Sequence, residues 1–203
     1  MRTLACIIII TITANNLLSQ SGSVEDKLTN IEIGLGIFAN YEKKLTNVST
    51  IRYELGLDYY FYGGLLWNPT RHNLTPTIQI EHRWYFNINK KHLKGKNISN
   101  NNSWFISSYI KYFPDLFVIS NVKNMWKPDV FNFMSLIGYK KNMNQHFYLE
   151  AAAGLGYSHV YSRTGIYFVD GFYYTSSIRQ MAYLRIGYRI FKKEKTPELT
   201  MKF

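Results

Sequence analysis

The sequence predicts an all-β fold, namely a single antiparallel up-and-down β-barrel of about eight strands that follows an export signal. Apolar and polar residues alternate with a period of two along most of the chain, which is typical of strands with two different faces. Aromatic residues make up 17% of the 203 residues, so the chain has enough apolar surface to fold as one domain. Beyond residue 20, no stretch approaches the roughly 20 apolar residues that a membrane-spanning helix needs.

Residues 1–19 have the layout of a secretory signal peptide: a short positive end, an apolar run over 4–12, and then small polar residues. We expect cleavage after Ser19, within two residues either way, which leaves 20–30 as a short lead before the barrel. The single cysteine, Cys6, lies in this signal segment. The mature chain therefore has no disulfide, no thiol nucleophile and no cysteine ligand for a metal.

The first three strands are expected at 31–41, 51–61 and 77–88, where the alternation is most regular. In the second, the apolar face carries Ile51, Tyr53, Leu55, Leu57, Tyr59 and Phe61, and the opposite face carries Arg52, Glu54, Gly56, Asp58 and Tyr60. A helix would not keep those apolar groups together on one side. The sequence therefore predicts strands with one apolar and one polar face.

The remaining strands are expected at 103–113, 130–140, 147–161, 166–175 and 182–190. The segment 166–175 also fits a long loop, because Gly165, Asp170 and Gly171 favour turns. Turn-like sequences such as Asn68-Pro69 separate the strands, and no proline is expected in the middle of a strand.

Three features favour a barrel that turns its apolar face to lipid over a soluble lipocalin-like barrel that buries it around a ligand. Strands of about eleven residues, tilted near 45°, are long enough to cross the hydrocarbon layer. Tyr, Trp and Phe gather near strand ends, as at 59–62 and 84–86, and such side chains favour membrane–water boundaries. The polar faces also carry acids and bases in equal number, as expected of groups that pair inside a narrow barrel.

The predicted lumen charge network consists of five acids and five bases: Glu32, Arg52, Glu54, Asp58, Glu81, Arg83, Lys111, Glu150, Arg185 and Arg189. An eight-stranded barrel is just wide enough for its own side chains to fill it. We therefore expect a polar plug in preference to a porin-like or gated ion path.

The final strand, LRIGYRIF at 184–191, ends on an aromatic residue. Together with the signal segment and the alternating strands, it resembles the small outer-membrane β-barrel proteins of the OmpA and OmpX kind, over about 31–191. The resemblance implies an outer-membrane location, contact with lipopolysaccharide, and recognition by the barrel-assembly machinery and periplasmic chaperones. It makes Gly187, Tyr188 and Phe191 the assembly signal. Members of that family often stop at the terminal aromatic residue, whereas this chain continues through a basic tail at 192–203.

Some eight-stranded outer-membrane barrels modify lipid A acyl chains, so an esterase-type site is an alternative. It would need a serine and a histidine close together with a carboxylate behind the histidine. His82 and Ser108 share the lipid-facing side of neighbouring strands, whereas Ser158 and His159 lie on opposite faces. No third member stands at a recognisable spacing, and HExxH-type metal spacing is absent. We predict no catalytic residues, no metal and no cofactor.

A basic run at 90–96 (KKHLKGK) resembles a polyanion-binding patch. In an exported barrel, lipopolysaccharide phosphates or plain solvation are better partners for it than nucleic acid. The sequence thus predicts a monomeric, non-enzymatic outer-membrane barrel with a filled polar lumen and a structural or surface-interaction role. Both termini should face the periplasm if the strand number is even.

Overall fold

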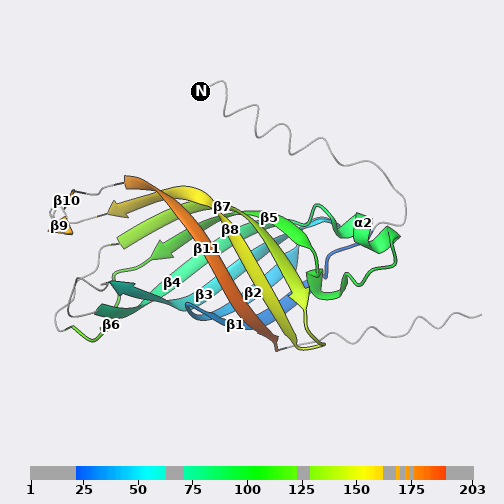
Figure 1. Cartoon of the computed structure of the whole chain (residues 1–203), viewed down its shortest axis with the longest axis horizontal. Coiled ribbons are helices and arrows are strands. Elements are labelled where there is room, and N and C mark those ends of the chain that lie inside the picture. The colour runs from blue at the N-terminus through cyan, green and yellow to red at the C-terminus, as the bar shows by residue number, and fades with distance from the viewer. Residues whose placement is uncertain are drawn as a thin grey trace, which may run out of the picture.

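The computed structural model describes residues 22–62, 71–122, 129–161, 168–169, 172–173 and 176–190. It confirms the all-β fold and the single antiparallel barrel: the described residues are 70% strand with almost no helix, and a sheet of 9 strands closes into a ring of 8. Figure 1 shows the ring with its long axis horizontal. The predicted signal peptide, Phe191 and the tail lie outside the described residues.

Eight strands form the wall of the barrel: β1 (Lys27–Gly34), β2 (Gly36–Lys44), β3 (Ser49–Tyr62), β4 (Arg71–Trp84), β5 (Trp104–Phe113), β7 (Asp129–Asn142), β8 (Phe147–Tyr161) and β11 (Ser176–Arg189). Each pairs antiparallel with the wall strands before and after it, and β11 pairs with β1 to close the ring. The short β6 (Ile119–Ser120) pairs with β4 beyond the end of β5. The result is an up-and-down barrel.

The predicted first strand at 31–41 is wrong as one strand, because the chain turns at Leu35 and forms the hairpin of β1 and β2. Gly34 pairs with Gly36, whose φ of +134° is a conformation that glycine adopts readily and other residues rarely. One residue separates the paired glycines, so Ile33 and Ile37 lie opposite each other with the same parity. The side chains therefore continue to alternate across the turn, and the pattern looks like an unbroken strand.

The segment 166–175 does not supply a barrel strand in its described part. Here β9 (Phe168–Val169) and β10 (Phe172–Tyr173) pair with each other in a separate two-stranded sheet. The expected total of eight holds because the division of 31–41 adds the strand that this segment does not provide.

Strand β4 starts and ends earlier than the predicted 77–88, and it contains Pro76, so the expectation of a proline-free strand is wrong. Even-numbered residues of β4 direct their peptide groups toward β5 and β6, as the carbonyl of His72 does when it accepts a bond from the backbone N–H of Asn121. The ladder on that side is interrupted between the β6 and β5 pairings, which is where Pro76 lies. The missing N–H therefore leaves no ladder bond unmade.

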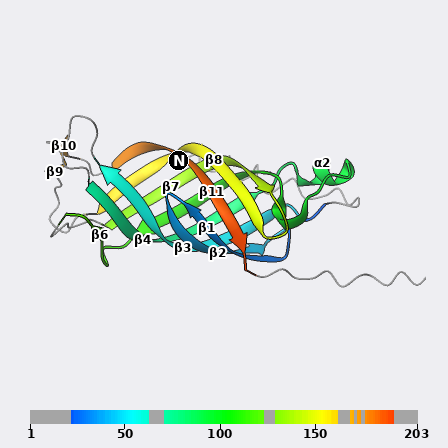
Figure 2. The same cartoon turned by 60° about the horizontal axis from the view of Figure 1, so that its bottom comes forward.

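Between β4 and β5 the chain forms α2 (Ile88–Leu93) and a short 3-10 turn, η1 (Ser99–Asn101), where we expected a solvated loop. The lead to β1 passes close to this segment, and Val24 is buried against Tyr85, Ile88 and Phe105. These apolar side chains close one end of the barrel. Figure 2 shows α2 at this end and β9 and β10 at the other.

The two faces of the wall differ as the alternation predicts. Leu55, Ile80 and Ile186 point outward and are 61%, 49% and 53% exposed, whereas Glu54 and Arg83 point inward and are 1% and 0% exposed. The outer face is apolar and the interior is charged. Within the described residues, no helix has the length and apolarity to cross a membrane.

Candidate functional site

Three arginines and four glutamates meet inside the barrel and form what we call the central charge network: Arg52, Arg83, Arg185, Glu32, Glu54, Glu81 and Glu150. They come from five different strands, β1, β3, β4, β8 and β11. The network exists only once the ring has closed, because pairs such as Arg83 with Glu150 lie on strands that are not neighbours.

Arg52 of β3 binds carboxylates from three strands. Its Nη2 donates to Glu32 at 2.5 Å and to Glu54, and its Nη1 donates to Glu150 at 3.3 Å. All four side chains are fully buried. A buried charge without a partner is costly, so these contacts are needed for the barrel to fold around the arginine.

Arg83 of β4 holds Glu150 with both arms of its guanidinium group, Nη1 to Oε2 at 2.8 Å and Nη2 to Oε1 at 2.7 Å. The same Nη2 also donates to Glu81 at 3.0 Å. The guanidinium carbon lies 4.4 Å from the centroid of the Phe105 ring. Two parallel bonds fix both position and orientation, which makes this the best-defined pair in the lumen.

Arg185 extends the network to β11. Its Nη1 donates to Glu32 at 2.9 Å and to Glu54 at 2.8 Å, so these two carboxylates are shared between Arg185 and Arg52. The Arg185 guanidinium also lies 4.0 Å from the centroid of the Phe38 ring. Arg185 therefore links β11 to β1 and β3.

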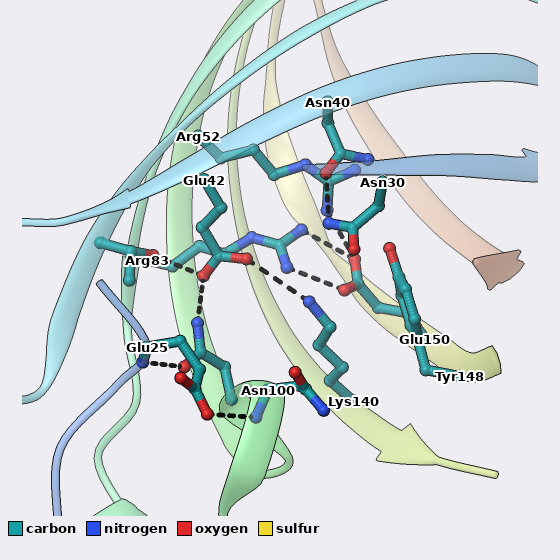
Figure 3. Close-up of polar contacts among 12 residues, drawn as sticks. Glu25, Asn30, Asn40, Glu42, Arg52, Arg83, Asn100, Lys140, Tyr148 and Glu150 are labelled. Carbon is teal, nitrogen blue, oxygen red and sulfur yellow. Dashed lines mark hydrogen bonds and ion pairs between the residues drawn. The ribbon is translucent and has the colours of Figure 1, made fainter. Parts of the chain in front are cut away.

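A second cluster surrounds Glu42, which lies outside the predicted lumen charge network. Its Oε1 accepts bonds from Thr50 at 2.8 Å, from Tyr85 at 2.7 Å and from Asn101 at 2.8 Å, and its Oε2 lies 3.4 Å from Nζ of Lys140 (Figure 3). Glu42 and Lys140 are buried. This cluster lies toward the end of the barrel that carries α2.

The inward position of Glu42 and Lys140 could have been predicted from the alternation of side chains along the strands. Glu42 shares the inward parity of Glu32, but the predicted strand stopped at Tyr41. Lys140 shares the inward parity of Gly138 in the predicted strand at 130–140. Hydroxyl groups were missed as well: Tyr148 donates to Glu32 at 2.5 Å.

All ten charged residues that the sequence placed in the lumen are buried, at most 8% exposed: Glu32, Arg52, Glu54, Asp58, Glu81, Arg83, Lys111, Glu150, Arg185 and Arg189. Seven of them form the central charge network, while Lys111 forms a separate ion pair with Asp58. Arg189 does not join: it donates to the carbonyl of Gln145 at 2.9 Å and to the side chain of Asn142. Arg189 is therefore buried at the end of β11 without an ion pair among the described residues.

The opposite wall of the lumen is apolar. Tyr109, Met134, Leu136 and Ala152 are buried there, and Met181 packs against them. Charged and apolar side chains together fill the middle of the barrel, since Arg52, Arg83 and Glu150 show no exposure to solvent.

The candidate esterase residues do not form a site. His82 lies opposite Ser108 on the outer face, and Ser108 hydrogen-bonds Ser135 at 3.1 Å. In the described part of the chain neither His82 nor Ser108 hydrogen-bonds a carboxylate, and no group of three His, Cys, Asp or Glu side chains could hold a metal ion. Ser158 is buried and His159 is exposed, so they lie on opposite faces as expected.

The predicted assembly signal has a packing role that the sequence did not reveal. Gly187 faces inward, and a Cβ atom there would overlap the ring of Tyr148. Tyr188 points outward and contacts the rings of His146 and Phe147, at centroid distances of 5.7 Å and 5.2 Å.

The basic run lies on α2 and the turn after it, at the end of the barrel that also carries the lead. Comparison of the chain with family models, with curated proteins and with solved structures finds no match.

Proposed function

We propose that the protein is a non-enzymatic outer-membrane barrel with a filled lumen, which serves as a structural or surface-interaction element of the envelope. The observation that carries this proposal is the sidedness of the wall. Large apolar side chains such as Leu55 and Leu184, each 61% exposed, cover the outside, while the acids and bases are inside. A water-soluble barrel would lose stability by exposing so large a contiguous apolar surface.

Two bands of aromatic side chains support a membrane environment. At the α2 end the outward rings include Tyr41, Tyr53, Trp84, Phe86, Trp104, Tyr139, Phe147 and Tyr188, and at the other end they include Tyr59, Phe61, Tyr112, Phe131, Phe133 and Tyr157. Rings pack against each other within each band. The ring centroids of Trp104 and Tyr139 are 5.0 Å apart, and those of Tyr112 and Phe131 are 4.4 Å apart. Membrane barrels carry such bands at the two boundaries of their apolar belt.

The filled lumen argues against a conducting pore. The central charge network blocks the barrel with side chains that hold one another at hydrogen-bond distance, and an eight-stranded barrel has no spare width around them. A porin-like path would need these pairs to separate, which would leave buried charges without partners.

Cell fractionation tests the proposal. We expect the protein in the detergent-extracted outer-membrane fraction, with a gel mobility that changes on heating. Recovery as a soluble periplasmic protein would favour the lipocalin-like alternative and contradict the proposal. A steady conductance in planar bilayers that falls on changing Arg83 or Glu150 would instead favour a pore. Loss of a lipid A modification in the His82→Ala or Ser108→Ala variant would favour an enzyme.

A further inference from the structure

We propose that the hollow between α2 and the outer ends of β5 and β7 binds the phosphate of a membrane phospholipid headgroup. This inference rests on the proposed membrane location and adds a ligand to a surface that faces the leaflet on the α2 side. The hollow has a volume of about 390 Å³, and its lining combines two lysines, three asparagines and two aromatic rings.

The aromatic rings place the hollow at the edge of the apolar belt. Trp104 and Tyr139 lie directly opposite each other on β5 and β7, and their ring centroids are 5.0 Å apart. Lys91 of α2 reaches over this pair, with its Nζ 5.8 Å from the centroid of the Tyr139 ring. An ammonium group just beyond boundary aromatics stands at the depth of lipid phosphates.

The charge in the hollow has no internal counterion. Neither Lys91 nor Lys96 forms an ion pair with a residue that the structure describes. Lys91 donates one hydrogen bond to the backbone carbonyl of Asn102, which leaves two of its three ammonium hydrogens for a ligand. Partial burial lowers the pKa of Lys91, and the positive charge of Lys96 lowers it further. A bound anion would relieve that repulsion.

Hydrogen-bond donors complete the site. The Oδ1 of Asn97 accepts bonds from the backbone N–H of Ser99 at 2.8 Å and from its hydroxyl at 2.6 Å, and the Oδ1 of Asn87 accepts a bond from Ser103 at 3.5 Å. The two amide nitrogens have no partner among the described residues, so they are available as donors. A phosphate group offers only acceptor oxygens when it is ionised, which matches ammonium and amide donors.

The segment that carries the site is fixed to the barrel. The backbone N–H of Lys140 donates to the carbonyl of Ser103 at 3.0 Å, and Asn142 donates to the carbonyl of Ser99 at 2.6 Å. The backbone N–H of Lys96 donates to the carbonyl of Lys91 at 2.9 Å, which sets the spacing of the two lysines. A site held this firmly loses little conformational freedom on binding.

A lipid fits better than free phosphate. Below the aromatic pair, Ile106 and Ile137 lie opposite each other and are 42% and 50% exposed, so acyl chains can follow the wall from the headgroup. The α2 end also carries the lead, and we expect both termini to face the periplasm. The basic run would then meet phospholipid of the inner leaflet and not, as its sequence predicts, lipopolysaccharide.

Native mass spectrometry of the detergent-purified, full-length mature barrel with added dilauroyl phosphatidylglycerol tests the proposal. The Lys91→Ala/Lys96→Ala variant should bind the lipid about tenfold or more weakly, because it loses two charge-assisted contacts. The matched control is Lys90→Ala/Lys94→Ala, which removes the same charge from the same segment outside the hollow, and it should change the affinity less than threefold.

Equal losses in the two variants would mean nonspecific attraction and would overturn the site, as would no loss in either. Inorganic phosphate should not compete at the concentrations at which the lipid binds, and full competition would overturn the lipid assignment. Both variants should keep the heat-dependent gel mobility of the unchanged protein. If the protein fractionates as soluble, the proposed function fails. If it fractionates with the membrane and Lys91 and Lys96 do not matter, this inference alone fails.

Discussion

Glu150 accepts four hydrogen bonds inside the lumen. It receives both arms of Arg83, one arm of Arg52 and the hydroxyl of Tyr183 at 2.9 Å. Its removal leaves two buried guanidinium groups short of a partner, whereas simultaneous removal of Arg83 reduces that imbalance. Removing one member of the pair is therefore expected to cost more stability than removing both.

We predict that Glu150→Ala lowers the free energy of unfolding by about 3–5 kcal/mol, the usual cost of breaking a buried ion pair. Urea unfolding in lipid vesicles, followed by the loss of heat-dependent gel mobility, measures it. The Arg83→Met/Glu150→Ala double variant should recover part of the loss, since one unpaired charge is gone. A double variant that is less stable by the sum of the single effects would show that the two residues act independently.

Gly187 has two competing explanations, a recognition signal for assembly and a space for Tyr148. We predict that Gly187→Ala lowers stability by about 1–3 kcal/mol, because the added methyl group displaces the Tyr148 ring and its bond to Glu32. In a Tyr148→Ala background the same change should have little effect on urea unfolding. If Gly187→Ala unfolds like the unchanged protein but reaches the membrane slowly in cells, the assembly role is the correct one.

Much of the residue-scale arrangement could be predicted because parity decides which side chains face inward. The alternation of side chains does not tell which inward residues contact one another. Arg52 and Glu32 meet across the lumen from strands that are separated by β2, so their contact depends on strand number, tilt and stagger. The position of Arg189 beyond the network, beside Asn142, depends on the same stagger.

The β1–β2 hairpin is shorter than the strands beside it, and its length limits the pairing of β11. Its pairing with β11 ends at Ile33 opposite Ile186, so the part of β11 from 176 to 185 has no described strand on that side (Figure 1). Even-numbered residues of β11 direct their N–H groups there, as Ile190 does when it donates to the carbonyl of Thr29. In the described part of the chain, β11 is therefore paired on its β1 side over only part of its length.

We predict that the backbone N–H groups of Gln180 and Ala182 exchange with deuterium at least tenfold faster than those of Ile186 and Tyr188, because only the latter pair face β1. Residue-resolved hydrogen exchange in detergent micelles measures the difference. Odd-numbered neighbours, which bond to β8, serve as the internal control. Equal protection of all four groups would mean that another part of the chain covers this edge.

At the scale of elements, the sequence located the long strands well and the connections poorly. The predicted 51–61, 103–113 and 147–161 lie within or within one residue of β3, β5 and β8, because a period of two over these segments indicates a strand. The hairpin turn at Leu35 was hidden because a single-residue connection preserves parity. Helix α2 was hidden because its six residues are too few to show a helical stripe.

In the molecule as a whole, charged side chains lie inside the wall and apolar side chains lie outside it, which is the reverse of the arrangement in a soluble protein. Six acids, Glu32, Glu42, Glu54, Asp58, Glu81 and Glu150, are buried with five bases that pair with them. The sequence predicted this sidedness from charge balance on the polar faces. It also gave the right strand number through two compensating errors, one hairpin unrecognised and one strand too many.

The environment of the outer face can be tested with one residue type at two positions. Leu55 lies in the middle of β3 and is 61% exposed, and Leu45 lies in the turn after β2 and is 53% exposed. If the belt faces hydrocarbon, Leu55→Arg should lower the free energy of unfolding by about 2–4 kcal/mol, because a guanidinium at mid-depth must leave water. Leu45→Arg should change it by no more than about 0.5 kcal/mol, as for ordinary surface positions. Urea titrations of both variants in vesicles give the comparison. In a barrel surrounded by water both changes would be equally mild, since both leucines have similar exposure, so equal free energies would contradict the membrane assignment.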